Sequence, residues 1–101
     1  MSIGLTCFTN LPFVDLQKSL DGWHKQYSDI FPEHYYLSDA GISDHIDIEI
    51  SNEFGLDPKS YFYMSVNNKY LIISTDKIAA LVREELGKDN VVILLNGEDL
   101  I

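Results

Sequence analysis

The chain has 101 residues, 46% of them hydrophobic, which suits one globular domain over residues 1–101 and excludes a disordered chain. Its formal net charge of −9 argues against binding of nucleic acid or of an anionic membrane, and favours basic proteins or cations as partners. A single cysteine excludes an internal disulfide framework, and without a signal-peptide pattern or a long apolar run we expect a cytoplasmic protein.

The first third of the chain predicts a strand followed by an amphipathic helix. Residues 2–8 alternate in the way of a strand with one buried face. Asn10 and Pro12 suit a helix start, and Phe31-Pro32 ends the helix because the residue before proline disfavours helical angles. Six apolar residues between these limits recur at steps of three and four and share one stripe: Phe13, Leu16, Leu20, Trp23, Tyr27 and Ile30.

The middle of the chain predicts four strands. Residues 34–37 could form a short one, and residues 44–51 alternate cleanly between polar side chains and isoleucine. Residues 61–66 and 69–74 read as strands joined by Asn67-Asn68, because asparagine tolerates the positive φ of a two-residue hairpin turn.

The last third predicts a helix and a final buried strand. Ser74 or Thr75 can cap a helix over residues 76–86, and Gly87 suits its end. Residues 90–95 then form a strand, which a right-handed parallel crossover would join to the strand at 69–74. The order β-α-β-β-β-β-α-β predicts the α+β class, as a two-layer α/β sandwich. Its sheet would have five to six mostly antiparallel strands, with two helices on one face.

The sequence holds no motif specific to one reaction. Its six glycines form neither GxGxxG nor GxxxxGK[ST], and no serine lies in a GxSxG elbow. The thiol of Cys7 shares its parity with Leu5 and is expected in the core. We therefore predict no cofactor and no catalytic residue.

One row of polar residues could bind a metal ion. On a strand, His45, Asp47 and Glu49 would point the same way, but successive same-face residues are about 6.6–7 Å apart. Ligands of one ion lie about 2.0–2.2 Å from it, so all three could not easily converge. A solvated strand face is the simpler interpretation, and a metal-dependent protein or enzyme remains an alternative.

The charge distribution is the stronger signal. Between Lys25 and Lys59 there are eight acidic residues and no lysine or arginine, whereas the rest of the chain has eight acidic and seven basic residues. Because self-repulsion of this kind is not needed for a fold, the acidic interval suggests a binding surface. It also carries Tyr35 and Tyr36, whose opposite parities allow only one to face inward on a strand, and tyrosine is enriched at binding hot spots.

These features predict a small acidic protein-binding module that is not an enzyme. In size and composition the chain resembles the small immunity proteins of bacteria, which are short, acidic and poor in catalytic motifs. That resemblance implies an inhibitor that occludes a basic toxin such as a nuclease. A structural subunit that dimerises through a sheet edge is a further alternative. The residues expected to bind the partner are Asp39, Asp44, Asp47, Glu49 and Glu53 for electrostatics, with Tyr35 and Tyr36 as anchors.

Overall fold

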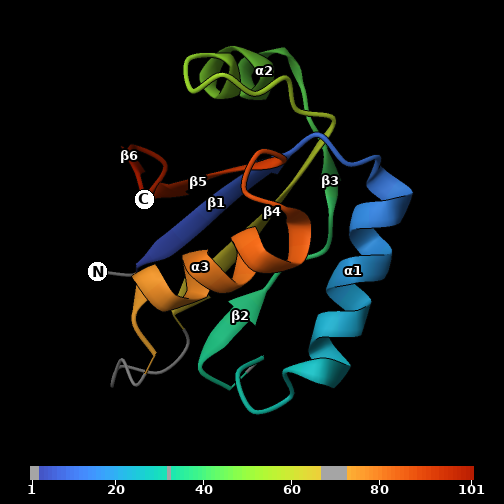
Figure 1. Ribbon diagram of the computed structural model, residues 1–101, viewed down its shortest axis with the longest axis vertical. Coiled ribbons are helices and arrows are strands. Elements are labelled where there is room, and N and C mark those ends of the chain that lie inside the picture. Colours follow the sequence, from blue (N-terminus) through green and yellow to red (C-terminus); the bar gives the residue numbers. More distant parts are fainter. Residues whose placement is uncertain (1–2, 32, 67–72) are drawn as a thin grey trace.

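A computed structural model describes residues 3–31, 33–66 and 73–101, which form one open sheet with helices on both faces (Figure 1). The described pairings in this six-stranded sheet are all antiparallel, so the predicted α+β sandwich is confirmed. In chain order the elements are β1 (Gly4–Thr9), α1 (Phe13–Gln26), β2 (Tyr35–Leu37), β3 (Gly41–Ile42), α2 (His45–Asn52), β4 (Ser60–Val66), α3 (Thr75–Leu86), β5 (Val91–Leu95) and β6 (Asp99–Leu100).

β1 lies in the middle of the sheet, whose strand order is β2-β4-β1-β5-β6. It pairs with β4 over its whole length and with β5 on its other edge. β2 and β3 share the outer edge of β4, β2 at its C-terminal end and β3 at its N-terminal end. Ser38 extends the pairing of β2, because its N–H donates to the carbonyl of Tyr63 (2.9 Å) and its Oγ accepts the N–H of Tyr63 (2.8 Å).

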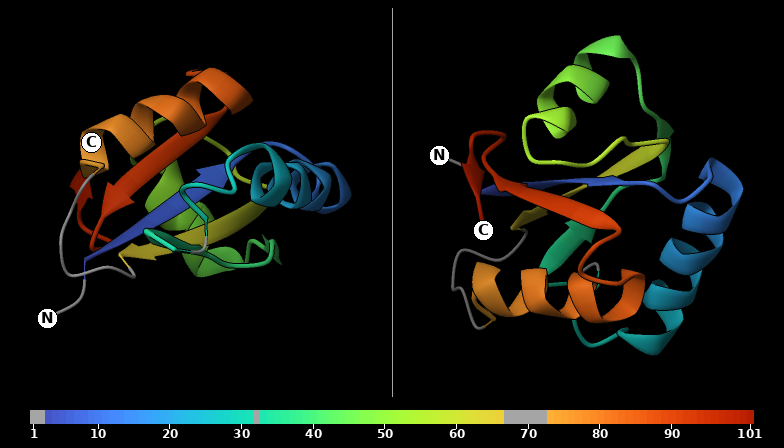
Figure 2. Two further views of the ribbon diagram at one scale, coloured as in Figure 1. Left: turned by 90° about the horizontal axis from the view of Figure 1, so that it is seen from below. Right: turned by 45° about the horizontal axis from the view of Figure 1, so that its top comes forward.

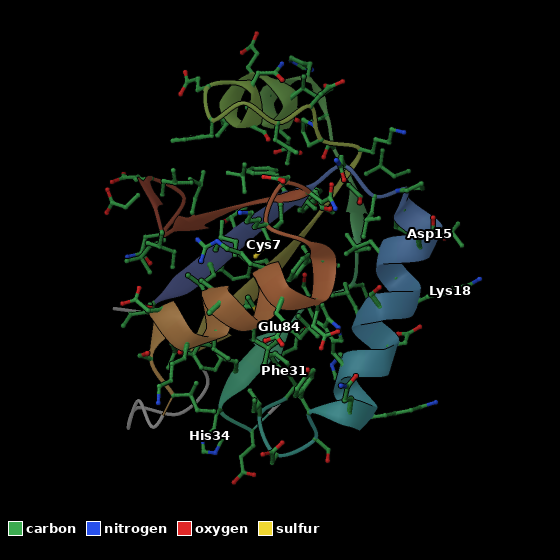
Figure 3. All side chains as sticks on the ribbon, in the orientation of Figure 1. Cys7, Asp15, Lys18, Phe31, His34 and Glu84 are labelled. Atoms are coloured by element: carbon green, nitrogen blue, oxygen red, sulfur yellow. The ribbon has the colours of Figure 1, made fainter. Side chains whose placement is uncertain are left out.

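The main core lies between one face of the sheet and the two helices α1 and α3. Cys7 and Phe62, which are paired across β1 and β4, are fully buried there, and the ring of Trp23 meets that of Phe62 edge to face at 5.7 Å. Figure 3 shows Cys7 between α3 and the sheet. Burial raises the pKa of its thiol, so Cys7 is the predicted core residue and not a nucleophile. The buried residues of the two helices are Leu16, Leu20, Trp23, Ile78, Ala79, Val82 and Leu86.

The two predicted helices are present, and one is shorter than expected. The hydroxyl of Ser74 accepts the N–H of Lys77 (3.2 Å) at the start of α3, and Gly87 ends it with φ of +91°, as its sequence predicts. α1 ends at Gln26, so Ile30 is buried in the turn that follows and not on the helix. Among the described residues no helix is long and apolar enough to cross a membrane.

The predicted strand at 44–51 is wrong: these residues form most of a third helix, α2. Asp44 and Asp47 explain the error, because together they make a reciprocal capping box that satisfies the first backbone N–H groups of a helix. On the helix Ile48 turns away from Ile46 and Ile50, which lie one turn apart on the same side. Of these two, Ile50 packs against the sheet, whereas Ile46 is 54% exposed. α2 lies on the face of the sheet opposite α1 and α3.

Three further predictions fall wholly or partly on residues outside the described ranges. The hairpin turn at Asn67-Asn68 and most of the strand at 69–74 belong to them, and so does the parallel crossover into the last strand. The last strand itself is present as β5. The two-residue strands β3 and β6 were not predicted; each is too short to show a pattern in the sequence.

The core predicts a large loss of stability for Phe62→Ala. This change removes a fully buried ring that contacts Trp23, and the free energy of unfolding should fall by about 3–5 kcal/mol. Denaturant unfolding measures the loss, with Phe13→Ala as the matched control, because that ring is 39% exposed on α1. Equal losses in the two variants would contradict this assignment of the core.

Candidate binding surface

The face of the sheet opposite α1 and α3, the outer face, is covered by α2 at one end (Figure 2). There a second small core forms around Phe8, Leu56, Val92 and Leu94, with Ile50 of α2 and Tyr61 of β4 packed against it. Farther from α2 along the outer face, Tyr63 and Tyr36 are 39% and 53% exposed. Both rings therefore lie at the surface of a sheet that is buried on its other side.

Tyr36 and Tyr63 lie next to each other on the outer face. Tyr36 is paired with Ser65, and Tyr63 is two residues from Ser65 on the same strand, which makes the tyrosines diagonal neighbours about 7–8 Å apart. On the other side of β4, Ser65 and Tyr63 face Gly4 and Thr6 of β1. These two tyrosines and the three small residues between and beside them are called the tyrosine patch.

The rings of Tyr63 and Tyr61 each pack flat against the sheet over a glycine of a neighbouring strand. A Cβ atom on Gly4 would stand 1.9 Å from the Oη of Tyr63, and one on Gly41 would stand 2.5 Å from the ring of Tyr61. Each ring thus occupies the space above a glycine, an arrangement that compensates for the missing side chain. Since the ring is held by the strand beside it, Tyr63 presents a fixed surface.

α2 begins at a cap made of two carboxylates. Asp44 Oδ1 accepts the N–H of Asp47 (2.9 Å), and Asp47 Oδ2 accepts the N–H of Asp44 (3.1 Å). The bond from the Asp47 N–H is the main reason why the pKa of Asp44 lies below its usual value. Two of the acids that the sequence predicts as partner-binding therefore have a structural task.

The row of His45, Asp47 and Glu49 that a strand would form does not exist. His45 and Glu49 on the helix and Glu53, the residue that caps its C-terminus, follow each other at intervals of four and share one exposed side, while Asp47 turns toward the N-terminal cap. In the ranges 3–31, 33–66 and 73–101, no group of three His, Cys, Asp or Glu side chains is arranged to hold a metal ion. Glu49 and Glu53 make this exposed side acidic.

The other predicted partner-binding residues have separate places. Tyr35 points into the main core, 1% exposed, and its hydroxyl donates to the carbonyl of Ile73 (2.6 Å), so it cannot anchor a partner at the surface. Tyr36 faces outward, as the opposite parities of the pair require. Asp39 is exposed in the connection from β2 to β3, where it lies 3.5 Å from Nε2 of Gln17 on α1 and apart from α2.

Positive charge is concentrated on the helices that cover the main core. Of the six basic residues in the described ranges, five lie on α1, on α3 or directly after α3, and Figure 3 shows Lys18 extending away from α1. From Asp44 to Lys59, α2 and the loop that follows carry five acids and one base. The net charge of the chain is thus displaced toward α2, beside the outer face.

Comparison with known proteins identifies the family. The family model described as "CDI System Immunity Component" matches residues 1–99. The chain belongs to this family of immunity components. No curated protein matches the chain by sequence.

A solved structure has the same fold as this immunity protein. It is the CdiA-CT/CdiI toxin and immunity complex from Burkholderia pseudomallei, in which the matching chain is 21% identical, with a TM-score of 0.90. The match covers 97% of this chain and 95% of the other. The predicted function, an immunity protein that inhibits a toxin, agrees with the family.

Sequence reasoning missed Tyr63, which is exposed on the outer face of the immunity protein. Tyr61 and Tyr63 alternate with the buried Phe62 and Met64, so their parity places both on the outer face. This signal was available, but a strand with large apolar side chains on both parities is equally typical of a central, fully covered strand. The side of α2 that faces the sheet could not be known before α2 was recognised as a helix.

We predict that Asp44→Ala unravels α2 locally. The variant loses the acceptor for the Asp47 N–H, and the melting temperature should fall by roughly a few degrees. Amide hydrogen exchange should accelerate most over residues 47–51, within α2. Asp44→Asn is the control, because its side chain still accepts; protection of α2 in the alanine variant as strong as in the asparagine variant would contradict the role of the cap.

The cap also predicts a pH dependence. Because the pKa of Asp44 is lower in the folded protein, its carboxylate stabilises the fold fully above the usual pKa of about 3.9, and this contribution is lost as the pH falls through the lowered value. Asp44→Asn has no such group, so wild type and variant should differ in the acid limb of their stability curves. Superimposable curves in thermal melts from neutral to acid pH would contradict this assignment.

Proposed function

We propose that this protein neutralises a basic toxin by binding to it and covering its functional site, without catalysis, in the cytoplasm. The family and the toxin–immunity complex of similar fold support a toxin as the partner. The observation that carries the proposal is the acidic side of α2, where Glu49 and Glu53 are exposed and free of the cap. A surface of this sign attracts a basic partner.

A nuclease is the most concrete form of the toxin. Such an enzyme needs positive charge to bind phosphates, and carboxylates spaced along a helix can take the place of those phosphates. Inhibition would then follow from occupation of the substrate site.

The proposal predicts that charge reversal on α2 slows association. In Glu49→Lys/Glu53→Lys the association rate with the toxin should fall by about tenfold or more at low salt, and the difference should shrink as salt is added. The toxin is obtained by affinity capture from the native host, with attention to the product of the adjacent gene, and rates are measured by stopped flow.

The matched control carries the same change of charge on the other side of the molecule. Asp29→Lys/Glu84→Lys alters exposed residues in the turn after α1 and on α3, and it should affect the rate much less. Equal slowing in the two variants would show that only the net charge of the protein matters, and it would contradict a specific role of α2. Failure of the wild type to capture a toxin would contradict the proposal as a whole.

The alternatives differ in their support. A metal-dependent protein acting through an acidic strand face loses its basis, since that strand is a helix. A homodimer through a sheet edge stays a prediction, although the outer strands β2, β3 and β6 have only two or three residues to pair. Light scattering of the purified protein at high concentration tests it.

A further inference from the structure

From the outer face we infer that the toxin-binding surface extends beyond α2 onto the tyrosine patch, which binds cationic side chains, above all arginine, of the same toxin. This inference rests on the proposed function and adds to it a second contact area with a different task. The acids of α2 would accelerate encounter, and the patch would slow dissociation.

The patch adjoins the part of the sheet that α2 covers. Tyr61 packs against the small core under α2, Tyr63 follows two residues later on the same face of β4, and Tyr36 is its diagonal neighbour. A partner that contacts the exposed side of α2 can therefore reach the patch without crossing a helix. Figure 2 shows α2 standing at one end of the sheet, with the rest of that face beside it.

The patch has the properties of an anchor site. Tyr36 and Tyr63 are exposed aromatic side chains on a rigid sheet, and the ring of Tyr63 is already held above Gly4. An anchor fixed before binding loses little conformational freedom in the complex, and aromatic residues dominate binding hot spots. The residues between the rings are small, so a long side chain can approach them closely.

The charge of the surroundings selects a cationic occupant. The described part of the outer face presents serine, threonine, glycine and tyrosine at the patch, and α2 beside it is acidic, whereas the bases lie mainly on α1 and α3. Arginine fits this setting best, because its planar guanidinium stacks on aromatic faces and is more weakly hydrated than an ammonium group. A basic toxin supplies such side chains.

Dissociation rates test the patch. In Tyr36→Leu/Tyr63→Leu the dissociation rate from the captured toxin should rise about tenfold or more, while the association rate changes little. Phe13→Leu is the matched control, because this aromatic side chain on α1 has the same 39% exposure as Tyr63 and should leave both rates unchanged. Circular dichroism melts must show that each variant is folded; if the double variant is not, Tyr36→Leu alone is used, since Tyr36 supports no glycine.

A second variant tests the chemistry. Tyr36→Phe/Tyr63→Phe keeps both ring faces and removes both hydroxyls, so it should retain slow dissociation if the rings stack on cations. Fast dissociation of the phenylalanine variant would overturn stacking, and slow dissociation of the folded leucine variant would overturn the patch. Neither result affects the proposed function, which fails separately if charge reversal on α2 leaves association unchanged.

Discussion

The structure depends on β1 being paired on both edges and packed on both faces. Leu5 and Cys7 point into the main core with α1 and α3, while Phe8 points into the small core with α2. A strand in this position fixes the register of both β4 and β5. If β1 slipped by one residue, the side chains of its two faces would change places. The two faces of β1 therefore decide which side of the sheet meets α1 and α3 and which side meets α2.

The outer face shows how the same sheet provides a core and a surface. One helix of eight residues covers the end that carries Phe8 and Val92, and beyond it the outward side chains of β1, β4 and β2 are small or tyrosine. Tyrosine suits such a place, because its ring shields the sheet while its hydroxyl stays in water. The ring of Tyr63 above Gly4 covers part of this open face without a helix.

The sequence predicted those parts in which a pattern is long enough to exclude alternatives. Periodicity over a dozen residues located α1 and α3, and the parities of Tyr35 and Tyr36 predicted that one faces inward. Residues 44–51 were mistaken because alternation over eight residues competes with a cap formed by only Asp44 and Asp47. The contact of Ile50 with the outer face of the sheet also favours the helix, but it is a tertiary contact that the local sequence does not reveal.

This correction changes what the acidic interval can do. A strand at 44–51 would have placed Asp47 and Glu49 side by side on one face. The helix instead assigns Asp44 and Asp47 to its own N-terminus, and Asp39 lies beside Gln17 of α1. The carboxylates left free on α2 are those of Glu49 and Glu53, one turn apart on the exposed side. Carboxylates at the start of the helix stabilise it through its dipole, whereas those near its end oppose the dipole. Glu49 and Glu53 take no part in the cap and gain nothing from the helix dipole, so under the proposed function they are free to bind a partner.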